Sequence, residues 1–319
     1  MSSTSDKAVL DRANIPSNPY VVGRPLTGAS AALFVGREDV FAWLAENLAA
    51  GERPNALLLY GERRIGKTSA LYQLVEGERG RPLRAGLGRR LLPAYVDLQR
   101  LAGCRTDEWL RRLARDIYRQ VAQQRPTRAM PRGRAGDDSA YAVFDRALDH
   151  LETHLPAGDL ILLAIDELEQ MRAGIDAGLL DEAVSPFLRS QVQHRARLVV
   201  VFSGSYGLLE SYWQPLIDLT ARYELGPLDF AAAATLIRAP LAGELAVDEA
   251  AVERIWRQTG GRPFAIQSIC HRLVSLRHRQ RRGDPIGAED VQWAIDEAAA
   301  EPHGMGRPLA GGAAAGASL

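Results

Sequence analysis

The sequence predicts an α/β fold: a parallel five-stranded sheet flanked by helices, followed by a small all-helical region. Three observations lead to this prediction. Short apolar runs of strand length alternate with amphipathic helical stretches, as in folds whose strands are joined by helical crossovers. One of these runs leads into a glycine-bounded loop that opens a helix. From about Asp229 onward, only helical patterns remain.

The loop is Gly61-Glu62-Arg63-Arg64-Ile65-Gly66-Lys67-Thr68, which fits the phosphate-binding pattern G-x-x-x-x-G-K-[ST]. Only two of the 39 basic residues are lysines, Lys7 and Lys67. A lysine ammonium is a compact point charge that fits between phosphate oxygens, whereas a guanidinium is a broad planar fork. The sequence therefore predicts a P-loop NTPase in which residues 61–69, Ser69 included, bind the phosphates. Lys67 is expected to reach the β- and γ-phosphates, and the Thr68 hydroxyl to bind Mg²⁺.

A second apolar run, residues 160–167, ends in Asp166 and Glu167. An unbroken apolar run is typical of a central parallel strand covered on both faces. Ligands bind beyond the carboxyl ends of such strands. We therefore expect Asp166 to hold Mg²⁺ through water and Glu167 to orient or deprotonate the attacking water.

The remaining elements follow from the same patterns. Strands are predicted at residues 56–60, 92–98, 160–167, 197–203 and, as a short edge strand, 222–225. Helices are predicted at residues 40–48, 68–75, 107–122, 139–155 and 179–193. Residues 76–90 and 126–138 are expected to be surface loops. After the fourth strand, the hydroxyl of Ser203 or Ser205 is expected either to approach the γ-phosphate or to belong to an ordinary turn.

The predicted domains are an N-terminal extension (1–32), an α/β domain (33–228), a helical lid (229–302) and a disordered tail (303–319). The lid contains four predicted helices, at residues 230–241, 248–259, 263–282 and 287–300. Residues 277–282 form a basic cluster late in the third of them. This cluster is interpreted either as a solvated helix end or as a contact with nucleic-acid phosphates.

Four motifs together resemble the STAND and archaeal-type P-loop ATPases, a group related to the AAA+ proteins. They are Leu33-Phe34-Val35-Gly36-Arg37-Glu38, the loop at residues 61–68, the acidic strand end at residues 162–167, and Gly261-Arg262-Pro263. The resemblance implies that Gly36 and Arg37 lie near the nucleotide, that Pro263 packs on its base or ribose, and that the lid changes pose between ATP and ADP. Members of the group often carry an arginine after the fourth strand. Ser203-Gly204-Ser205 stands there in this chain, so Arg262 or an arginine of another subunit is expected to sense the γ-phosphate.

The leading hypothesis is a molecular switch that binds and hydrolyses ATP, with ATP/ADP and Mg²⁺ as its cofactors. We expect the switch to act on an unidentified protein partner, and a homo-oligomer is one possible form of its assembly. The preference for ATP over GTP rests on the resemblance. One alternative is a DNA-associated ATPase of the replication-initiator or transposition-helper type. Another is a scaffold that binds nucleotide without hydrolysing it.

Composition narrows these hypotheses. The 319 residues carry a formal net charge of zero, so no global field attracts the chain to DNA or to a membrane surface. Cys104 and Cys270 lie far apart in the sequence, which fits a reduced compartment. We found neither a long apolar span nor an N-terminal signal core, so we expect a cytoplasmic protein without membrane contact.

Overall fold

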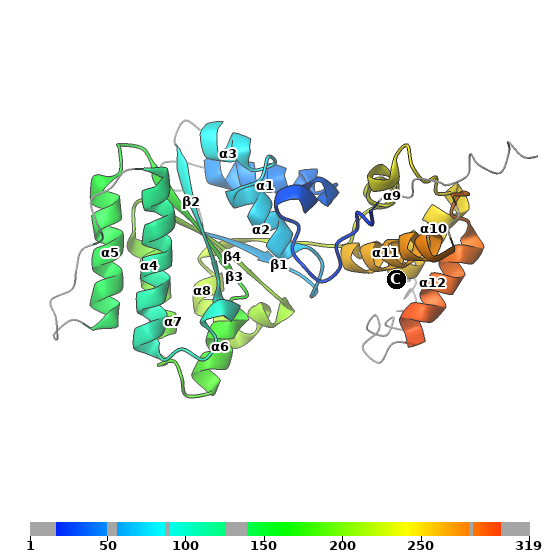
Figure 1. The fold of residues 1–319 in the computed structure, drawn as a ribbon. Coiled ribbons are helices and arrows are strands. Elements are labelled where there is room, and N and C mark those ends of the chain that lie inside the picture. The colour runs from blue at the N-terminus through cyan, green and yellow to red at the C-terminus, as the bar shows by residue number, and fades with distance from the viewer. Residues whose placement is uncertain are drawn as a thin grey trace, which may run out of the picture. The chain divides into compact units, whose positions relative to one another are not determined.

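The computed structural model describes residues 17–49, 56–86, 90–125, 130, 139–280 and 283–300. It contains two compact units, Pro25–Gly226 and a second that joins the residues before Pro25 to those from Pro227 onward (Figure 1). The predicted disordered tail and nearly all of the predicted loop at 126–138 lie outside the described residues.

The first unit is built on a five-stranded parallel sheet, as predicted. Its strands are β1 (Ala56–Tyr60), β2 (Leu91–Asp97), β3 (Leu160–Asp166), β4 (Leu198–Gly204) and β5 (Thr220–Glu224), in the order β2-β3-β4-β1-β5. Every residue of β3 and β4 is buried, because helices cover both faces of the central strands. β5 is an edge strand that pairs only with β1, and its residues are partly exposed.

Helices cover the sheet on two sides (Figure 1). One side carries α1 (Glu38–Ala49), α2 (Lys67–Val75) and α3 (Arg81–Gly86). The other side carries α4 (Thr106–Gln124), α5 (Ala140–His154), α6 (Glu169–Asp176), α7 (Val184–His194) and α8 (Gln214–Ile217). The apolar stripe predicted for α4 faces the core: Leu110, Leu113, Ile117 and Val121 are fully buried. The helix α6 was not predicted from the sequence, and α7 begins at Val184 instead of 179.

The glycine- and arginine-rich segment 76–90 is not wholly a loop, because it contains α3. The hydrogen bonds of Arg84 explain why a helix forms in this segment. Its guanidinium donates to the carbonyl of Leu74 at 2.7 Å and to that of Gly77 at 3.0 Å. These carbonyls belong to the last turn of α2 and the residues after it, where a cation is favoured by the helix dipole. These hydrogen bonds connect α3 to the C-terminal end of α2.

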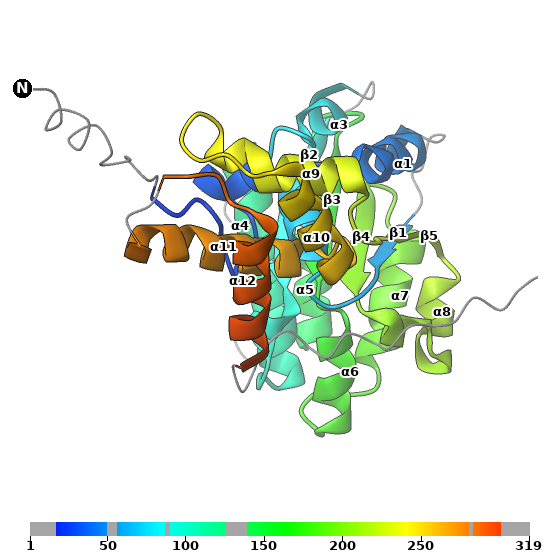
Figure 2. The same ribbon diagram turned by 90° about the vertical axis from the view of Figure 1, so that its right-hand side faces the viewer.

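The second unit contains the four predicted helices, here α9 (Phe230–Arg238), α10 (Glu249–Thr259), α11 (Pro263–Gln280) and α12 (Ala288–Ala300) (Figure 2). Part of the predicted N-terminal extension joins it: the Asn18 side chain donates to His271 O at 2.8 Å, and the Tyr20 hydroxyl donates to the Ile237 carbonyl. No helix in the described ranges is long and apolar enough to cross a membrane.

The basic cluster of α11 is not wholly a solvated helix end. Arg277 is 1% exposed, and its guanidinium lies 2.7 Å from Asp290 Oδ2 on α12 and 2.9 Å from Pro285 O. A buried charge requires a partner of opposite charge, and Asp290 supplies it. Arg277 thus joins α11 to α12, and the interpretation as a surface cation was wrong for this residue. Arg281 and Arg282 lie outside the described residues.

Candidate nucleotide-binding site

The predicted phosphate loop connects β1 to α2 and turns through positions that suit glycine. Gly66 precedes α2 with a φ of 105°, a value in the region that side chains rarely adopt. Gly61 has a φ of 154°, and a Cβ added there would lie 2.6 Å from Leu225 O on the segment after β5. The two glycines therefore allow the chain to curl over the end of the sheet and present the first N–H groups of α2 to a ligand.

Lys67 is folded onto this loop and is only 7% exposed. Its Nζ donates to Gly61 O at 3.0 Å and to Glu62 O at 2.8 Å. Burial lowers the pKa of Lys67, while the negative charges of Glu169, Glu167 and Asp166 oppose that shift. The ammonium therefore lies among acceptors that a phosphate could replace.

The carboxylate of Asp166, at the end of β3, is 1% exposed and accepts hydrogen bonds on both oxygens. Oδ1 accepts from Ser203 Oγ at 2.6 Å and from Glu167 N at 3.0 Å, and Oδ2 accepts from Tyr95 Oη at 3.0 Å. Three donors fix the orientation of this side chain. The Ser203 hydroxyl, 0% exposed, is directed at Asp166.

Glu167 is half-buried and has a φ of 55°, in the left-handed region. Burial raises its pKa, and the nearby carboxylates of Glu169 and Asp166 raise it further, against the opposing charges of Lys67 and Arg63. A carboxylate with a raised pKa is a better proton acceptor than an ordinary glutamate. This is the property that a base acting on water requires.

Two residues at this edge of the sheet, Tyr95 and Glu169, were not predicted from the sequence. The Tyr95 ring lies against Tyr72 of α2, with centroids 4.6 Å apart. Glu169 Oε1 accepts from Ser205 N at 3.0 Å, while its buried Oε2 has no hydrogen-bond partner among the described residues. A third acid so soon after Asp166 and Glu167 was a usable signal for Glu169. No local pattern identified Tyr95.

Arg37 connects the loop with the end of the sheet unit. Its guanidinium donates to Ile65 O at 3.1 Å and to Gly226 O at 2.6 Å. Among the described residues, the non-glycine positive φ values occur at Arg37 (71°), Arg64 (64°) and Glu167 (55°). Each costs on the order of 1–3 kcal/mol, and such strain is concentrated at functional sites. The three strained residues were all among those predicted from the sequence.

The other predicted residues are distributed as follows. Gly36 has a φ of 66° and precedes Arg37, and Ser69 Oγ accepts from Leu26 N at 3.1 Å. Arg262 and Pro263 belong to the second unit, where Pro263 begins α11. The structure thus brings Gly36, Arg37, residues 61–69, Asp166, Glu167 and Ser203 together within the sheet unit. It gives no such grouping for Arg262 and Pro263.

The donor set fits a magnesium ion. Mg²⁺ prefers hard oxygen ligands and keeps several of its waters, and an ionised carboxylate has about four lone-pair sites. Three sites of Asp166 are taken by Ser203, Glu167 N and Tyr95, which leaves one lone-pair site for a water-mediated contact. The Thr68 hydroxyl, at the start of α2, is half-buried and is a second oxygen donor of the required kind.

Replacing Ser203 by alanine is expected to lower the free energy of unfolding by about 1–3 kcal/mol, because Oδ1 of the buried Asp166 carboxylate then loses one of its two donors and keeps only Glu167 N. Urea denaturation measures this change. Tyr95→Phe should have a smaller effect, because Tyr95 is partly exposed and water can replace its hydroxyl. Equal, negligible effects of both substitutions would mean that the hydroxyls do not hold Asp166.

Comparison with known proteins agrees with this geometry. A family model described as an ATPase domain predominantly from Archaea matches residues 34–269. No curated protein sequence matches the chain. Several solved structures share the fold, with sequence identities below 20%. The ORC1 protein of Aeropyrum pernix, in complex with DNA, aligns with a TM-score of 0.57 and 19% identity over 83% of this chain. This chain spans 65% of the ORC1 chain.

Two further structures give similar values. A Walker-type ATPase of Pyrococcus abyssi has a TM-score of 0.61 and 17% identity, over 86% of this chain and 75% of that one. A RuvB variant of Thermotoga maritima has a TM-score of 0.53 and 17% identity, over 88% of this chain and 76% of that one. At these identities, the likeness establishes the fold of a P-loop NTPase.

Proposed function

Because the chain belongs to the family of ATPase domains found predominantly in Archaea, we propose that it binds Mg-ATP at the loop 61–69 and hydrolyses it as a molecular switch. The observation that carries this proposal is the grouping of Lys67, Asp166 and Glu167 at one edge of the sheet. A switch of this kind also needs a partner whose state it controls. The resemblance to STAND ATPases favours a protein partner and assembly into oligomers.

In the proposed mechanism, the free N–H groups at the start of α2 bind the phosphates. Lys67 exchanges its hydrogen bonds to Gly61 O and Glu62 O for hydrogen bonds to phosphate oxygens. The new bonds are stronger because a phosphate oxygen is negatively charged and a carbonyl oxygen is not. Thr68 and Asp166 would hold the magnesium ion, which supplies positive charge against the charge developing on the phosphates. Ser203 and Tyr95 keep the Asp166 carboxylate in one orientation.

Glu167 then acts on the attacking water as its base or by orienting it. Its fixed left-handed backbone conformation limits where the side chain reaches. Following the resemblance, we also assign Gly36 and Arg37 to the neighbourhood of the nucleotide, and Arg262 and Pro263 to a lid contact made when ATP is bound.

The direct test is ATP turnover by the purified protein across a series of protein concentrations, with and without duplex DNA. Turnover per molecule that rises with protein concentration and ignores DNA supports a switch that assembles with itself. Bound ATP without turnover under every condition contradicts hydrolysis by the chain alone and favours the non-hydrolysing scaffold.

The second candidate is a DNA-associated ATPase. It is favoured by the fold shared with ORC1, whose structure was solved in complex with DNA. Within the basic cluster, the burial of Arg277 against Asp290 removes that residue from any phosphate contact, which leaves Arg279 as the exposed arginine that the structure describes there. DNA-stimulated turnover that is lost in Arg279→Ala, together with salt-dependent binding, would favour this candidate.

The pH dependence of turnover should report the raised pKa of Glu167. The base works as a carboxylate, so activity is lost as the pH falls through this pKa, at a higher pH than for an ordinary glutamate. Glu169→Gln removes a neighbouring negative charge, lowers the pKa of Glu167, and should move the acid limb to lower pH. A pH profile of kcat measures the shift. Glu108→Gln, on α4, is the control with no expected shift, and an equal shift in both variants would contradict the assignment.

A further inference from the structure

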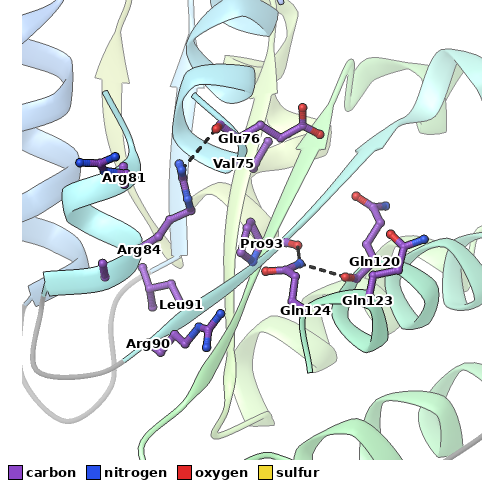
Figure 3. Close-up of a pocket in the computed structure, with 11 residues that line it drawn as sticks. Val75, Glu76, Arg81, Arg84, Arg90, Leu91, Pro93, Gln120, Gln123 and Gln124 are labelled. Atoms are coloured by element: carbon purple, nitrogen blue, oxygen red, sulfur yellow. Dashed lines mark hydrogen bonds between the residues drawn. The ribbon is translucent and has the colours of Figure 1, made fainter. Parts of the chain in front are cut away.

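The strand β2 forms the edge of the sheet opposite to β5, so its outward-facing backbone groups have no neighbouring strand to pair with. Leu160 N donates to Arg90 O, and because alternate residues of a parallel strand pair on the same side, Pro93 and Tyr95 face outward. An open edge exposes backbone donors and acceptors to water or to another chain. At this edge the helix α4 supplies side chains that take the place of a strand (Figure 3).

Gln120 binds the outward-facing groups of Tyr95 as a neighbouring peptide group would. Its Oε1 accepts from Tyr95 N at 2.9 Å, and its Nε2 donates to Tyr95 O at 2.9 Å. Nε2 also donates to Asp116 O, four residues earlier in α4, at 3.2 Å. A side-chain amide offers an acceptor oxygen and two donor hydrogens, and Gln120 uses all of them. The Gln120 amide therefore fixes both backbone groups of Tyr95 relative to α4.

Gln124, one helical turn later, makes a similar contact at the preceding outward position of β2. Its Nε2 donates to Pro93 O at 2.7 Å and to Gln120 O at 2.9 Å (Figure 3). Proline has no N–H, so its carbonyl is the one backbone group that needs a partner there. The two glutamines thus bind successive outward residues of the same strand. The residues they bind differ, because Pro93 lines the pocket drawn in Figure 3, whereas Tyr95 contacts Asp166.

The side chain of Tyr95 connects this edge with the candidate magnesium site. Its hydroxyl donates to Asp166 Oδ2 at 3.0 Å, and its ring lies against Tyr72 of α2. Burial raises the pKa of Tyr95, and the charge of Asp166 raises it further, so the hydroxyl stays protonated and remains a donor. Because a tyrosine ring is rigid, the place of this hydroxyl depends on the place of the Tyr95 backbone. A water could satisfy the Asp166 oxygen, but it would not fix its direction.

We propose that Gln120 is a positioning residue of the nucleotide site: it fixes the backbone of Tyr95, and Tyr95 thereby holds the Asp166 carboxylate in the orientation that a hydrated magnesium ion requires. The inference rests on the proposed function, because it takes the ion to be that of Mg-ATP. Gln120 acts through Tyr95 and touches neither nucleotide nor metal. Hydrogen-bond partners behind a metal ligand orient that ligand, and their loss weakens metal binding by about 10–100-fold.

The test follows the binding of a non-hydrolysable ATP analogue to the full-length protein by calorimetry, over a series of Mg²⁺ concentrations. Gln120→Met removes the amide but keeps the length and the helix propensity of the side chain. We expect this variant to need about threefold to tenfold more Mg²⁺ for half of the full gain in affinity, a modest effect because Asp166 holds the ion through water. Binding of the analogue in EDTA should stay unchanged, because the phosphate loop is intact.

Gln124→Met is the matched control. It removes the same kind of hydrogen bond, between the same helix and the same strand, but at Pro93. Its Mg²⁺ dependence should equal that of the unsubstituted protein. Equal shifts in the Gln120→Met and Gln124→Met variants, or no shift in either, would overturn the role of Gln120 and leave the proposed function standing. If the unsubstituted protein bound the analogue without any dependence on Mg²⁺, the magnesium site of the proposed function would fail, and this inference with it.

A double variant shows whether Gln120 acts through the Tyr95 hydroxyl. Tyr95→Phe alone should raise the required Mg²⁺ concentration about tenfold. Adding Gln120→Met to Tyr95→Phe should raise it no further, because the hydroxyl that Gln120 positions is already gone. Two effects that multiply independently would assign Gln120 to the stability of the fold and overturn the proposal.

Hydrogen exchange of the Tyr95 amide tests the contact itself, without nucleotide or metal. Gln120 Oε1 is the acceptor of this N–H, so exchange should be faster in Gln120→Met than in the unsubstituted protein. Gln124→Met should leave the exchange rate of Tyr95 unchanged. Equal exchange rates in all three proteins would mean that Gln120 does not hold the Tyr95 backbone, which would overturn the proposal.

Discussion

Lys67→Ala is expected to abolish tight ATP binding, with a loss of at least about a hundredfold in affinity. The substitution removes the compact cation of the loop, which would donate more than one charge-assisted hydrogen bond to phosphate oxygens, each worth about 1.5–3 kcal/mol. In the structure this ammonium donates hydrogen bonds to Gly61 O and Glu62 O, so it only has to exchange these acceptors for phosphate oxygens when a nucleotide binds. Calorimetry with a non-hydrolysable ATP analogue measures the loss.

Lys67→Arg is the matched variant that separates charge from shape. It keeps the positive charge, but a planar fork does not fit the space of an ammonium that is 7% exposed and hydrogen-bonded to its own loop. We expect Lys67→Arg to bind nucleotide weakly too, although less weakly than Lys67→Ala. An unchanged thermal unfolding transition in both variants would show that the fold is retained. Unimpaired binding by Lys67→Ala would mean that the nucleotide occupies another site.

The elements that could be predicted from the sequence are those encoded by local patterns. Residues 56–60 form β1 as predicted, because an apolar run of strand length stops at the glycine of the phosphate loop. β3 ends at Asp166 because the apolar run does. The helix α3 could not be predicted from its residues, because a segment rich in glycine and arginine suggests a loop. Its order depends on the hydrogen bonds from Arg84 to the end of α2, which no local pattern indicates.

Long-range contacts account for most of what the sequence could not reveal about the site. Tyr95 reaches Asp166 only because β2 and β3 are neighbours in the sheet, and the strand order is not encoded by any local period. Ser203 was predicted as a possible phosphate sensor from its place at the end of the fourth strand, yet its hydroxyl is directed at Asp166 because β3 and β4 are also neighbours. The positive φ values of Arg37 and Glu167 could not be predicted from the sequence, because residues of these types do not prefer the left-handed region.

Glu167→Gln is expected to keep ATP bound and to lower the turnover number about a hundredfold or more, the usual contribution of a general base. The amide has nearly the shape of the carboxylate but cannot accept a proton. It also removes one negative charge near Lys67, so phosphate binding should be retained or improved. Single-turnover hydrolysis measured beside equilibrium ATP binding separates the two effects.

Glu169→Gln is the informative companion to this variant. It removes a neighbouring carboxylate that raises the pKa of Glu167, but leaves the proposed base in place. We therefore expect Glu169→Gln to hydrolyse ATP with an altered pH profile, whereas Glu167→Gln should be slow at every pH because its amide does not titrate. Hydrolysis by Glu167→Gln at the rate of the unsubstituted protein would remove Glu167 from the mechanism. If Glu169→Gln were then the slow variant, the base would be Glu169, whose buried Oε2 has no partner among the described residues.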